Sequence, residues 1–450
     1  MKDLVLDSPP SIEQIFNNSL QNNTINLIKR DLVEFNSLEL KKIKFTRTTD
    51  DIEHYEFVKS NLELMHSLFP NFDWPLIRLC SIIKTWTKGF KGPEIINYAT
   101  TAFSINQTHD AFIYACRGIL ANFDSDNADL MIRKIMDETD DLQLQNIGNI
   151  FLSICYYEKG DFLKFENYIS EFRNNKEIDY NPYISIPVST VFVEDEVPSD
   201  ISKFSNIFDR YENFEKGDAK YIISCSSDLS YFKKYGEFMI RSFSRVCSHE
   251  AILHISIIDG NKNEILEIMN QIKGSNVFIT MHSQDLKINI GPIASLVRFI
   301  HIHDFLERYQ IPIVIMDLDS VIIKPLLQII LDNDDSHIGS RILKKGVAAW
   351  EKYTGGFAIF YNTDITKIVA KMIKNISISQ IRDDIDQWWI DQNCFEAGIR
   401  YALKNKNEVR VVDLYNTRDE YCIMPVGPEN SKLYTLREAM KKLDKYGKNT

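Results

Sequence analysis

Two acidic residues, Asp317 and Asp319, end the apolar stretch "IPIVIMDLD" at residues 311–319. The apolar residues predict a buried strand, and a tight turn after it can bring both carboxylates toward one point. Like charges held that close need a cation between them, or one of them must take up a proton. Hard oxygen ligands suit Mg²⁺ or Mn²⁺, which commonly bind substrate phosphates as well. We therefore predict that the pair binds a divalent cation, although an Asp after a strand also serves as a turn or helix cap.

The elements around this pair alternate between strands and helices from residue 219 onward. Strands are predicted in "KYIISCSS", "AILHISIIDG", "NVFITM" and "IPIVIMDLD", and helices over 230–246, 262–273 and 293–308. Such alternation with apolar strands is typical of a parallel α/β sheet that helices cover on both faces. Ligands of these sheets bind at the carboxyl ends of the strands. Asp317 and Asp319 lie at one of those ends.

The first 175 residues have the periodicity of helices instead. Ile147, Ile150, Phe151 and Ile154 share one helix face, and the same spacing returns after the break "EKGD". Gly and Asp in that break are good helix-stop and helix-start residues, so two antiparallel helices are predicted. The stretch "NIGNIFLSICYYEKGDFLKFENYISEF" resembles a tetratricopeptide repeat, and a plain helical bundle is the alternative.

These patterns divide the chain into three parts. An all-α domain of helical hairpins is predicted for 1–175, and an α/β domain for 219–450. The residues between them, 176–218, contain prolines and the acidic run "VFVEDEVPSD", which indicates a connector.

Composition excludes several classes of function. A chain of 450 residues with a net charge of −11 offers no broad basic face for nucleic acid. The N-terminal "MKDLVLDSPPSIEQ" lacks the apolar core of a signal peptide, and no run reaches the roughly 18 to 20 apolar residues of a membrane span. We therefore expect a cytoplasmic protein without a transmembrane segment. The seven cysteines show no CxxC spacing and are interpreted as buried free thiols.

Two enzyme families place a pair of acids after a strand in this way. In the GT-A glycosyltransferases, the DxD motif holds a divalent metal against the diphosphate of a nucleotide-sugar. "DLDSV" also matches the motif of haloacid-dehalogenase-type phosphatases, in which Asp317 would be a nucleophile and Asp319 a general acid. Three predicted strands precede the pair, whereas the phosphatase motif normally lies on the first strand of its domain. This order favours the transferase.

Four segments resemble GT-A enzymes of the glycogenin and lipopolysaccharide-galactosyltransferase type. "SCSSDLSYFKKYGEFMIRSF" resembles their nucleotide-binding first strand and helix, and "SLVRFIHIHDFL" the helix whose Arg supports the diphosphate. "YTGGFAIFYNTD" resembles the segment where small residues let the backbone approach the donor sugar, and "WWIDQNCFEAGI" contains the Asp-Gln pair that contacts the sugar. By this resemblance the donor-binding residues are Ser226, Ser227, Asp228, Tyr231, Asp317, Leu318, Gly355 and Gly356, and the catalytic residues are Arg298, Asp391 and Gln392.

The resemblance implies a Rossmann-like GT-A domain that uses Mn²⁺ or Mg²⁺ at Asp317 and Asp319 to transfer a sugar, with UDP as the nucleotide by family analogy. One feature departs from that pattern. The glycogenin-type enzymes take a third metal ligand from a His near the C-terminus, and no His follows His337 in this chain. Glu429, Asn430 or water is left for that position.

Several alternatives stay open at the level of sequence. The Asp391–Gln392 pair indicates retention of configuration, whereas Asp391 or Asp386 could act as an inverting base. The phosphatase hypothesis assigns its remaining roles to Lys344 or Lys345 and to Asp383–Asp384. A helical-repeat scaffold with an inactive transferase domain is a third hypothesis.

The helical domain has no part in donor chemistry under the transferase hypothesis. Stacked helical hairpins form concave surfaces that often bind peptides. We therefore expect this domain to select the acceptor, a polypeptide or a glycan, and a structural support or a homo-oligomer interface is the competing interpretation.

Overall fold

The computed structural model describes residues 25–42, 49–87, 90, 92–174, 195, 214–259, 262–272, 276–282, 290–343, 352–381, 390–415 and 417–446. The chain divides into two compact units. The first comprises Met1–Ile184 with Lys344–Ala348, and the second Ser185–Leu343 with Ala349–Thr450. The predicted connector, 176–218, lies outside the described residues apart from Asp195 and 214–218.

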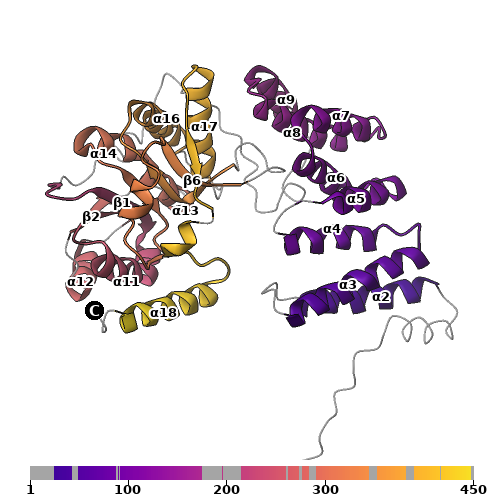
Figure 1. Ribbon diagram of the computed structural model, residues 1–450, viewed down its shortest axis with the longest axis horizontal. Coiled ribbons are helices and arrows are strands. Elements are labelled where there is room, and N and C mark those ends of the chain that lie inside the picture. The colour runs from indigo at the N-terminus through magenta and orange to yellow at the C-terminus, as the bar shows by residue number, and fades with distance from the viewer. Residues whose placement is uncertain are drawn as a thin grey trace, which may run out of the picture. The chain divides into compact units, whose positions relative to one another are not determined.

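The first unit is all-α in its described part, as predicted. Each helix contacts the next one along the chain, and the largest of these interfaces are those of α8 with α9 and of α5 with α6. The helices are α2 (Ile25–Lys42), α3 (Thr49–Leu68), α4 (Trp74–Thr87), α5 (Pro93–Ile105), α6 (His109–Asn122), α7 (Ser125–Met136), α8 (Leu142–Glu158) and α9 (Phe162–Asn174) (Figure 1).

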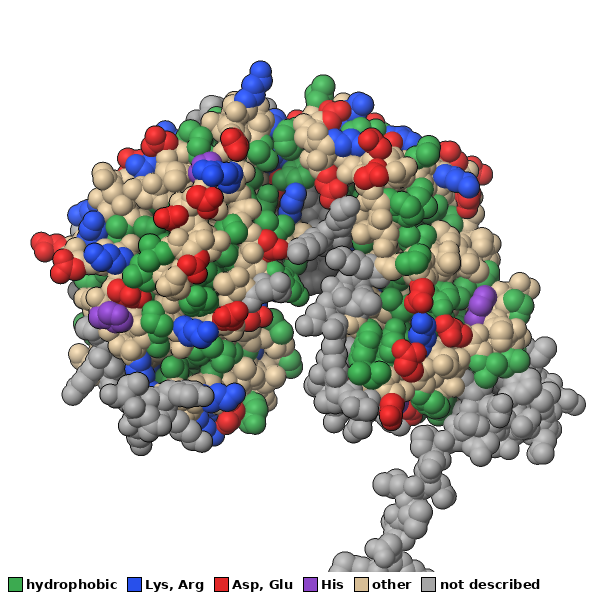
Figure 2. Space-filling view, in the orientation of Figure 1, with side chains coloured by type: hydrophobic (Ala, Val, Ile, Leu, Met, Phe, Trp, Pro, Cys, Tyr) green, Lys and Arg blue, Asp and Glu red, His purple; other side chains and the backbone are tan. Residues whose placement is uncertain are grey.

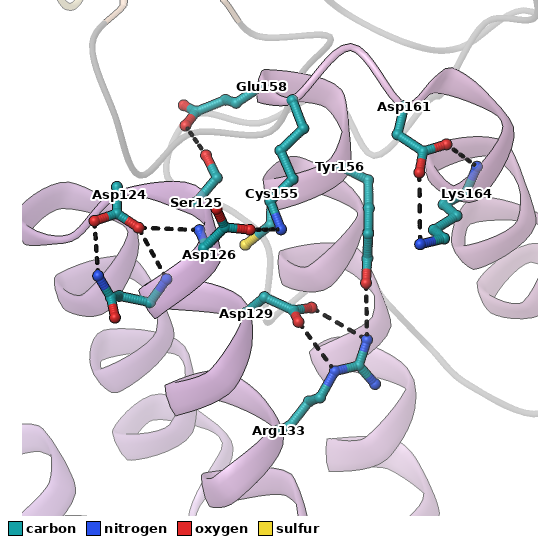
Figure 3. Close-up of polar contacts among 12 residues, drawn as sticks. Asp124, Ser125, Asp126, Asp129, Arg133, Cys155, Tyr156, Glu158, Asp161 and Lys164 are labelled. Atoms are coloured by element: carbon teal, nitrogen blue, oxygen red, sulfur yellow. Dashed lines mark hydrogen bonds and ion pairs between the residues drawn. The ribbon is translucent and has the colours of Figure 1, made fainter.

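The hairpin predicted at "EKGD" is confirmed. Helix α8 ends at Glu158, and Gly160 adopts φ 72°, a left-handed conformation that glycine tolerates best. Asp161 accepts a hydrogen bond from the backbone N–H of Lys164 at 3.2 Å and so caps α9. Neighbouring helices are also joined by side chains, since Arg133 of α7 donates to the hydroxyl of Tyr156 on α8 (Figure 3).

The second unit is built on a seven-stranded sheet with the order β3-β2-β1-β4-β7-β6-β8. A separate two-stranded sheet pairs β5 with β9. The strands are β1 (Tyr221–Asp228), β2 (Ala251–Ile258), β3 (Val277–His282), β4 (Ile313–Met316), β5 (Val321–Ile322), β6 (Ile338–Ile342), β7 (Tyr353–Phe360), β8 (Val411–Asp413) and β9 (Cys422–Ile423).

The sheet is mixed, which corrects the prediction of a parallel one. Strands β3, β2, β1 and β4 are parallel, but β7 runs antiparallel to both β4 and β6. The strand–helix alternation that predicted parallel pairing stops after β4. Only residues 343–352 separate β6 from β7, which is shorter than the dozen or more residues that a parallel crossover needs.

Helices cover both faces of this sheet because side chains alternate along its strands. Ile223 packs toward Phe232 and Phe243 of α11, whereas its neighbour Ile222 packs toward Phe305 of α14. Helices α11 and α12 cover the first face, and α13, α14, α16 and α17 the second. The helices of this unit are α11 (Leu229–Val246), α12 (Lys262–Ile272), α13 (Ile290–Ile300), α14 (Ile302–Tyr309), α15 (Leu327–Leu331), α16 (Asp364–Gln380), α17 (Ile390–Lys404), η2 (Arg418–Glu420) and α18 (Glu429–Tyr446).

The single helix predicted over 293–308 is two helices. Helix α13 ends at Ile300 and α14 begins at Ile302, with the fully buried His301 between them. The His301 ring stacks on the ring of His282 from β3, at 5.5 Å between centroids. Both helices keep the same apolar period, so the periodicity alone cannot reveal the break.

The predicted order of an all-α part before a Rossmann-like α/β part is confirmed. All seven cysteines are buried free thiols, also as predicted. No helix in the described part of the chain is long and apolar enough to span a membrane. On the face shown in Figure 2, acidic and basic side chains are interspersed rather than separated by sign.

Candidate active site

A pocket of about 440 Å³ lies at the carboxyl ends of β1 and β4 in the second unit. Residues of α11, α13, β7, α17 and α18 complete its wall. Every donor-binding, metal-binding and catalytic residue expected from the glycosyltransferase resemblance lines this pocket, except Gly355 and the alternative ligand Asn430. The strand-end position expected for an α/β sheet is therefore where these side chains meet.

Arg298 of α13 joins two of the predicted acids. Its Nη1 donates to Oδ1 of Asp317 at 2.5 Å, and its Nη2 donates to Oδ2 of Asp391 at 2.9 Å. Only 5% of Arg298 is exposed. Burial acts to lower the pKa of this guanidinium, but the two carboxylates outweigh it and raise the pKa. The group is a permanent buried cation at the end of β4.

Asp319 is held by a second cation of the chain. Lys432, in the first turn of α18, donates from Nζ to Oδ2 of Asp319 at 2.7 Å. Asp319 is 5% exposed, and burial together with the charge of Asp317 raises the pKa of its carboxyl, which the ammonium of Lys432 opposes. The Nζ of Lys432 also lies 3.5 Å from the hydroxyl of Tyr231.

The two strand-end acids would supply only part of a metal coordination sphere. Within the residues that the structure describes, no group of three or more His, Cys, Asp or Glu side chains is arranged to hold a metal ion. Glu429, one of the predicted third ligands, lines the pocket, but its Oε2 is 2.9 Å from Nζ of Lys234. Mg²⁺ is commonly bound through one or two carboxylates plus substrate phosphates and water. The two carboxylates fit a cation whose remaining ligands are phosphate oxygens of a substrate and water.

The two glycines of β7 leave room for these carboxylates. A Cβ on Gly356 would lie 2.6 Å from Oδ2 of Asp317, and a Cβ on Gly355 would lie 2.8 Å from Oδ2 of Asp391. Both values are below any ordinary carbon–oxygen contact. Gly355 thus lies directly against Asp391, although it does not itself line the pocket.

The predicted nucleotide-binding segment lies at the end of β1 and the start of α11. Ser226 Oγ donates to the carbonyl of Ala294 on α13, whereas the buried Oγ of Ser227 has no hydrogen-bond partner among the described residues. Asp228 caps α11 by accepting from the backbone N–H of Tyr231 at 2.8 Å. Its carboxylate therefore has the capping role that was the simpler sequence interpretation for an acid after a strand.

Asp391 and Gln392 open α17 and face the pocket. Asp391 is 3% exposed, and burial raises the pKa of its carboxyl against the opposing charge of Arg298. Its second oxygen, Oδ1, is buried and has no side-chain partner within the described part of the chain.

The residues that the competing hypotheses require are not among the described ones. Lys344, Lys345 and Asp383–Asp384, needed by the phosphatase hypothesis, and Asp386, the second candidate for an inverting base, lie outside the described residues. The acid pair follows β4, which three strands of the same sheet precede along the chain.

Sequence reasoning missed Lys432 and Tyr235, which also line the pocket. Both residues lie on helices. Lys432 follows Asp319 by 113 residues in the sequence. The available signal was the turn before α18, where Gly427 has φ 108° and precedes Pro428. That turn brings the first turn of the helix to the strand ends.

No protein-family model and no curated protein matches the sequence. Several solved glycosyltransferase structures are similar to it. The apo form of glycosyltransferase GlyE of Streptococcus pneumoniae TIGR4 is 11% identical, with a TM-score of 0.29 over 44% of this chain and 46% of that one. Mouse xyloside xylosyltransferase 1 is 10% identical, with a TM-score of 0.28 over 44% and 86%. Galactosyltransferase LgtC, in complex with donor and acceptor sugar analogs, is 13% identical, with a TM-score of 0.29 over 49% and 94%.

All three are glycosyltransferases, the class that the four sequence segments resemble. This chain spans less than half the length of GlyE.

Proposed function

We propose that this protein is a glycosyltransferase that binds a nucleotide-sugar, a UDP-sugar by the sequence resemblance, in the pocket at the ends of β1 and β4. One observation carries the proposal. Two cationic side chains, Arg298 and Lys432, and three carboxylates, Asp317, Asp319 and Asp391, meet in one pocket of about 440 Å³.

Each part of a nucleotide-sugar has a matching group in this pocket. The diphosphate needs positive charge, which Arg298 and Lys432 supply in a largely buried setting where charges are weakly screened. The sugar needs hydrogen-bond acceptors for its hydroxyls, and the carboxylate of Asp391 lines the pocket. Ser227 and Tyr231 line the part of the pocket assigned to the nucleoside.

The residues of the chain would share the work of transfer. Arg298 stabilises the negative charge that develops on the leaving nucleoside diphosphate. Asp391 orients the sugar and stabilises positive charge at its anomeric carbon. Asp317 and Asp319 hold the divalent cation, Mn²⁺ or Mg²⁺, which when bound offsets the charge of the diphosphate. With the Asp391–Gln392 pair beside the sugar, we expect retention of configuration.

A binding experiment tests the proposal. The melting temperature of the full chain is measured with UDP, GDP, CMP and their sugar conjugates, in Mn²⁺ and in EDTA. A ligand at 100 times its Kd stabilises the native state by about 2.7 kcal/mol, so a UDP-dependent rise that needs Mn²⁺ is expected. Asp319→Asn should abolish this rise and keep the ligand-free melting temperature close to that of the wild type. Asp334→Asn, a change of the same kind at an exposed residue, serves as the control.

Two results would contradict the proposal. The first is that no nucleotide or nucleotide-sugar shifts the melting temperature in Mn²⁺. The second is hydrolysis of a generic phosphomonoester by the wild type without any nucleotide, which would favour the phosphatase hypothesis.

The acceptor is assigned to the helical unit as part of the same proposal. Its described helices stack pairwise along the chain, and such arrays present extended surfaces that bind polypeptides. A fragment of the second unit should therefore hydrolyse the donor yet transfer poorly to the natural acceptor. The fragment must begin before Asp195, because this buried carboxylate pairs with Arg400 and Lys404 of α17. Transfer as efficient as that of the full chain would reject this role.

A further inference from the structure

Lys432 forms an ion pair with Asp319, a carboxylate that the proposed metal would use. Its Nζ lies 2.7 Å from Oδ2 of Asp319, the more buried of the two strand-end acids. Asp317 is likewise engaged by Arg298. In the described structure, therefore, cations of the chain itself already neutralise both predicted metal ligands.

A divalent cation and the Lys432 ammonium would compete for the same carboxylate, that of Asp319. If both were held at Asp319, two positive centres would lie within a few ångströms of each other around a largely buried carboxylate. Their repulsion opposes simultaneous binding, and it is stronger for a divalent ion than for a univalent one. Metal binding must therefore displace Lys432, and the displaced ammonium needs a new partner.

A nucleoside diphosphate would provide that partner. Lys432 lines the same pocket as Arg298, and it reaches the hydroxyl of Tyr231 at 3.5 Å from Nζ. A phosphate bound beside the metal would accept the hydrogen bond that Lys432 loses at Asp319.

The backbone of α18 is fixed, so the side chain of Lys432 is the part that can move. Leu436, Ala439 and Met440 pack this helix against Tyr235 and Val321. Its first turn is also joined to α11 by the Lys234–Glu429 ion pair. Lysine has four rotatable side-chain bonds, and 25% of this side chain is exposed, so the ammonium can swing without displacing the helix.

We propose that Lys432 is a positioning residue that blocks the metal site until the nucleotide arrives. It holds Asp319 when the pocket contains no nucleotide, and it moves to the diphosphate when metal and nucleotide bind together. The inference rests on the proposed function, because it needs a phosphate-bearing ligand and a metal at Asp319. Its consequence is that the metal alone binds weakly and that metal and diphosphate bind cooperatively.

The test measures Mn²⁺ binding to the full-length protein without nucleotide. The electron paramagnetic resonance signal of free Mn²⁺ gives its Kd for the wild type, Lys432→Met and Lys432→Gln. Both changes remove the charge and keep most of the length. Lys441→Met, a lysine of the same helix that pairs with Glu438, is the matched control. We expect the two Lys432 variants to bind Mn²⁺ at least tenfold more tightly than the wild type and the control.

A second readout separates this role from a structural one. UDP should improve the Mn²⁺ affinity of the wild type by a larger factor than that of the Lys432 variants, because only the wild type must release Asp319. Acylation of Lys432 in the wild type, followed by mass spectrometry, needs no variant. Mn²⁺ alone should increase the labelling, and Mn²⁺ with UDP should decrease it.

The outcomes distinguish the inference from the function on which it rests. If the wild type binds Mn²⁺ and UDP together, but the Lys432 variants bind Mn²⁺ alone no more tightly than the wild type, the inference is wrong and the function stands. The same holds if the labelling of Lys432 does not respond to Mn²⁺. If the wild type binds none of the tested nucleotides in the presence of Mn²⁺, both are wrong.

Discussion

Arg298 donates to Asp391 at 2.9 Å, although 93 residues separate them in the sequence. The same guanidinium holds Asp317 through its other terminal nitrogen. One buried cation thereby fixes the carboxylate at the end of β4 relative to the carboxylate at the start of α17. Arg298 therefore connects the part of the pocket assigned to the diphosphate with the part assigned to the sugar.

Replacing Asp391 by Asn should separate turnover from nucleotide binding. Asn keeps the shape but removes the charge that faces the sugar, so kcat should fall by about 100-fold or more while the affinity for UDP changes only a few fold. The buried charge-assisted bond to Arg298 is weakened, which should lower the free energy of unfolding by about 1–3 kcal/mol. Single-turnover kinetics and UDP titration give the two values. Loss of UDP binding equal to the loss of turnover would instead place Asp391 at the metal.

Gly356→Ala should damage the pocket and spare the fold. The new Cβ would lie 2.6 Å from Oδ2 of Asp317 and 3.0 Å from Cε of Met424, so the carboxylate must leave its position beside Arg298. UDP affinity in Mn²⁺ should fall about tenfold or more, equivalent to about 1.4 kcal/mol, with a melting temperature within a few degrees of the wild type.

Gly339→Ala is the matched control for that change. Its Cβ would meet Cδ1 of Leu414 at 2.8 Å, in the core of the sheet rather than at the pocket. It should lower stability and leave the UDP affinity of the folded protein unchanged. If both alanines behaved alike, the pocket role of Gly356 would be wrong.

How far the sequence predicts this site depends on where each residue lies along the chain. Asp317 and Asp319 follow an apolar strand, and Gly355–Gly356 lie within another, so local patterns mark them. The antiparallel direction of β7 and the approach of Lys432 to Asp319 depend on how distant segments pair. Local periodicity does not contain that information, and only the folded chain brings α18 against α11.

The buried histidines predict a fall in stability with acid. His254 and His301 are fully buried beside His282, with Lys374 also acting on His301. Burial, aided by His282, lowers the pKa of His254 to about 3, and burial also lowers that of His301 well below its ordinary value. The unfolded chain binds these protons below about pH 6.5, whereas the native state does not, so stability must fall as pH drops from about 6.5 toward 3.

Urea denaturation at pH 7, 6 and 5 measures this effect. Each such histidine contributes a slope of up to about 1.4 kcal/mol per pH unit once the pH is below its unfolded value. His254→Gln can keep the hydrogen bond to Thr280, at 2.8 Å in the wild type, and should reduce the slope by about that amount. His249→Gln, at an exposed position, should leave the slope as it is. An identical slope for His254→Gln and the wild type would reject the assignment.

Replacing Arg400 tests how strongly α17 holds Asp195. The guanidinium is fully buried in α17, donates to Oε1 of Glu396 at 3.0 Å and lies 3.4 Å from Oδ1 of Asp195. Arg400→Met preserves the apolar stem but leaves two buried carboxylates without this cation, so the free energy of unfolding should fall by about 3–5 kcal/mol. Lys404→Met removes a partly exposed partner of Asp195 and should cost no more than about 1 kcal/mol. Urea denaturation compares the two. A small, similar loss in both variants would mean that water reaches this cluster and that Asp195 does not depend on Arg400.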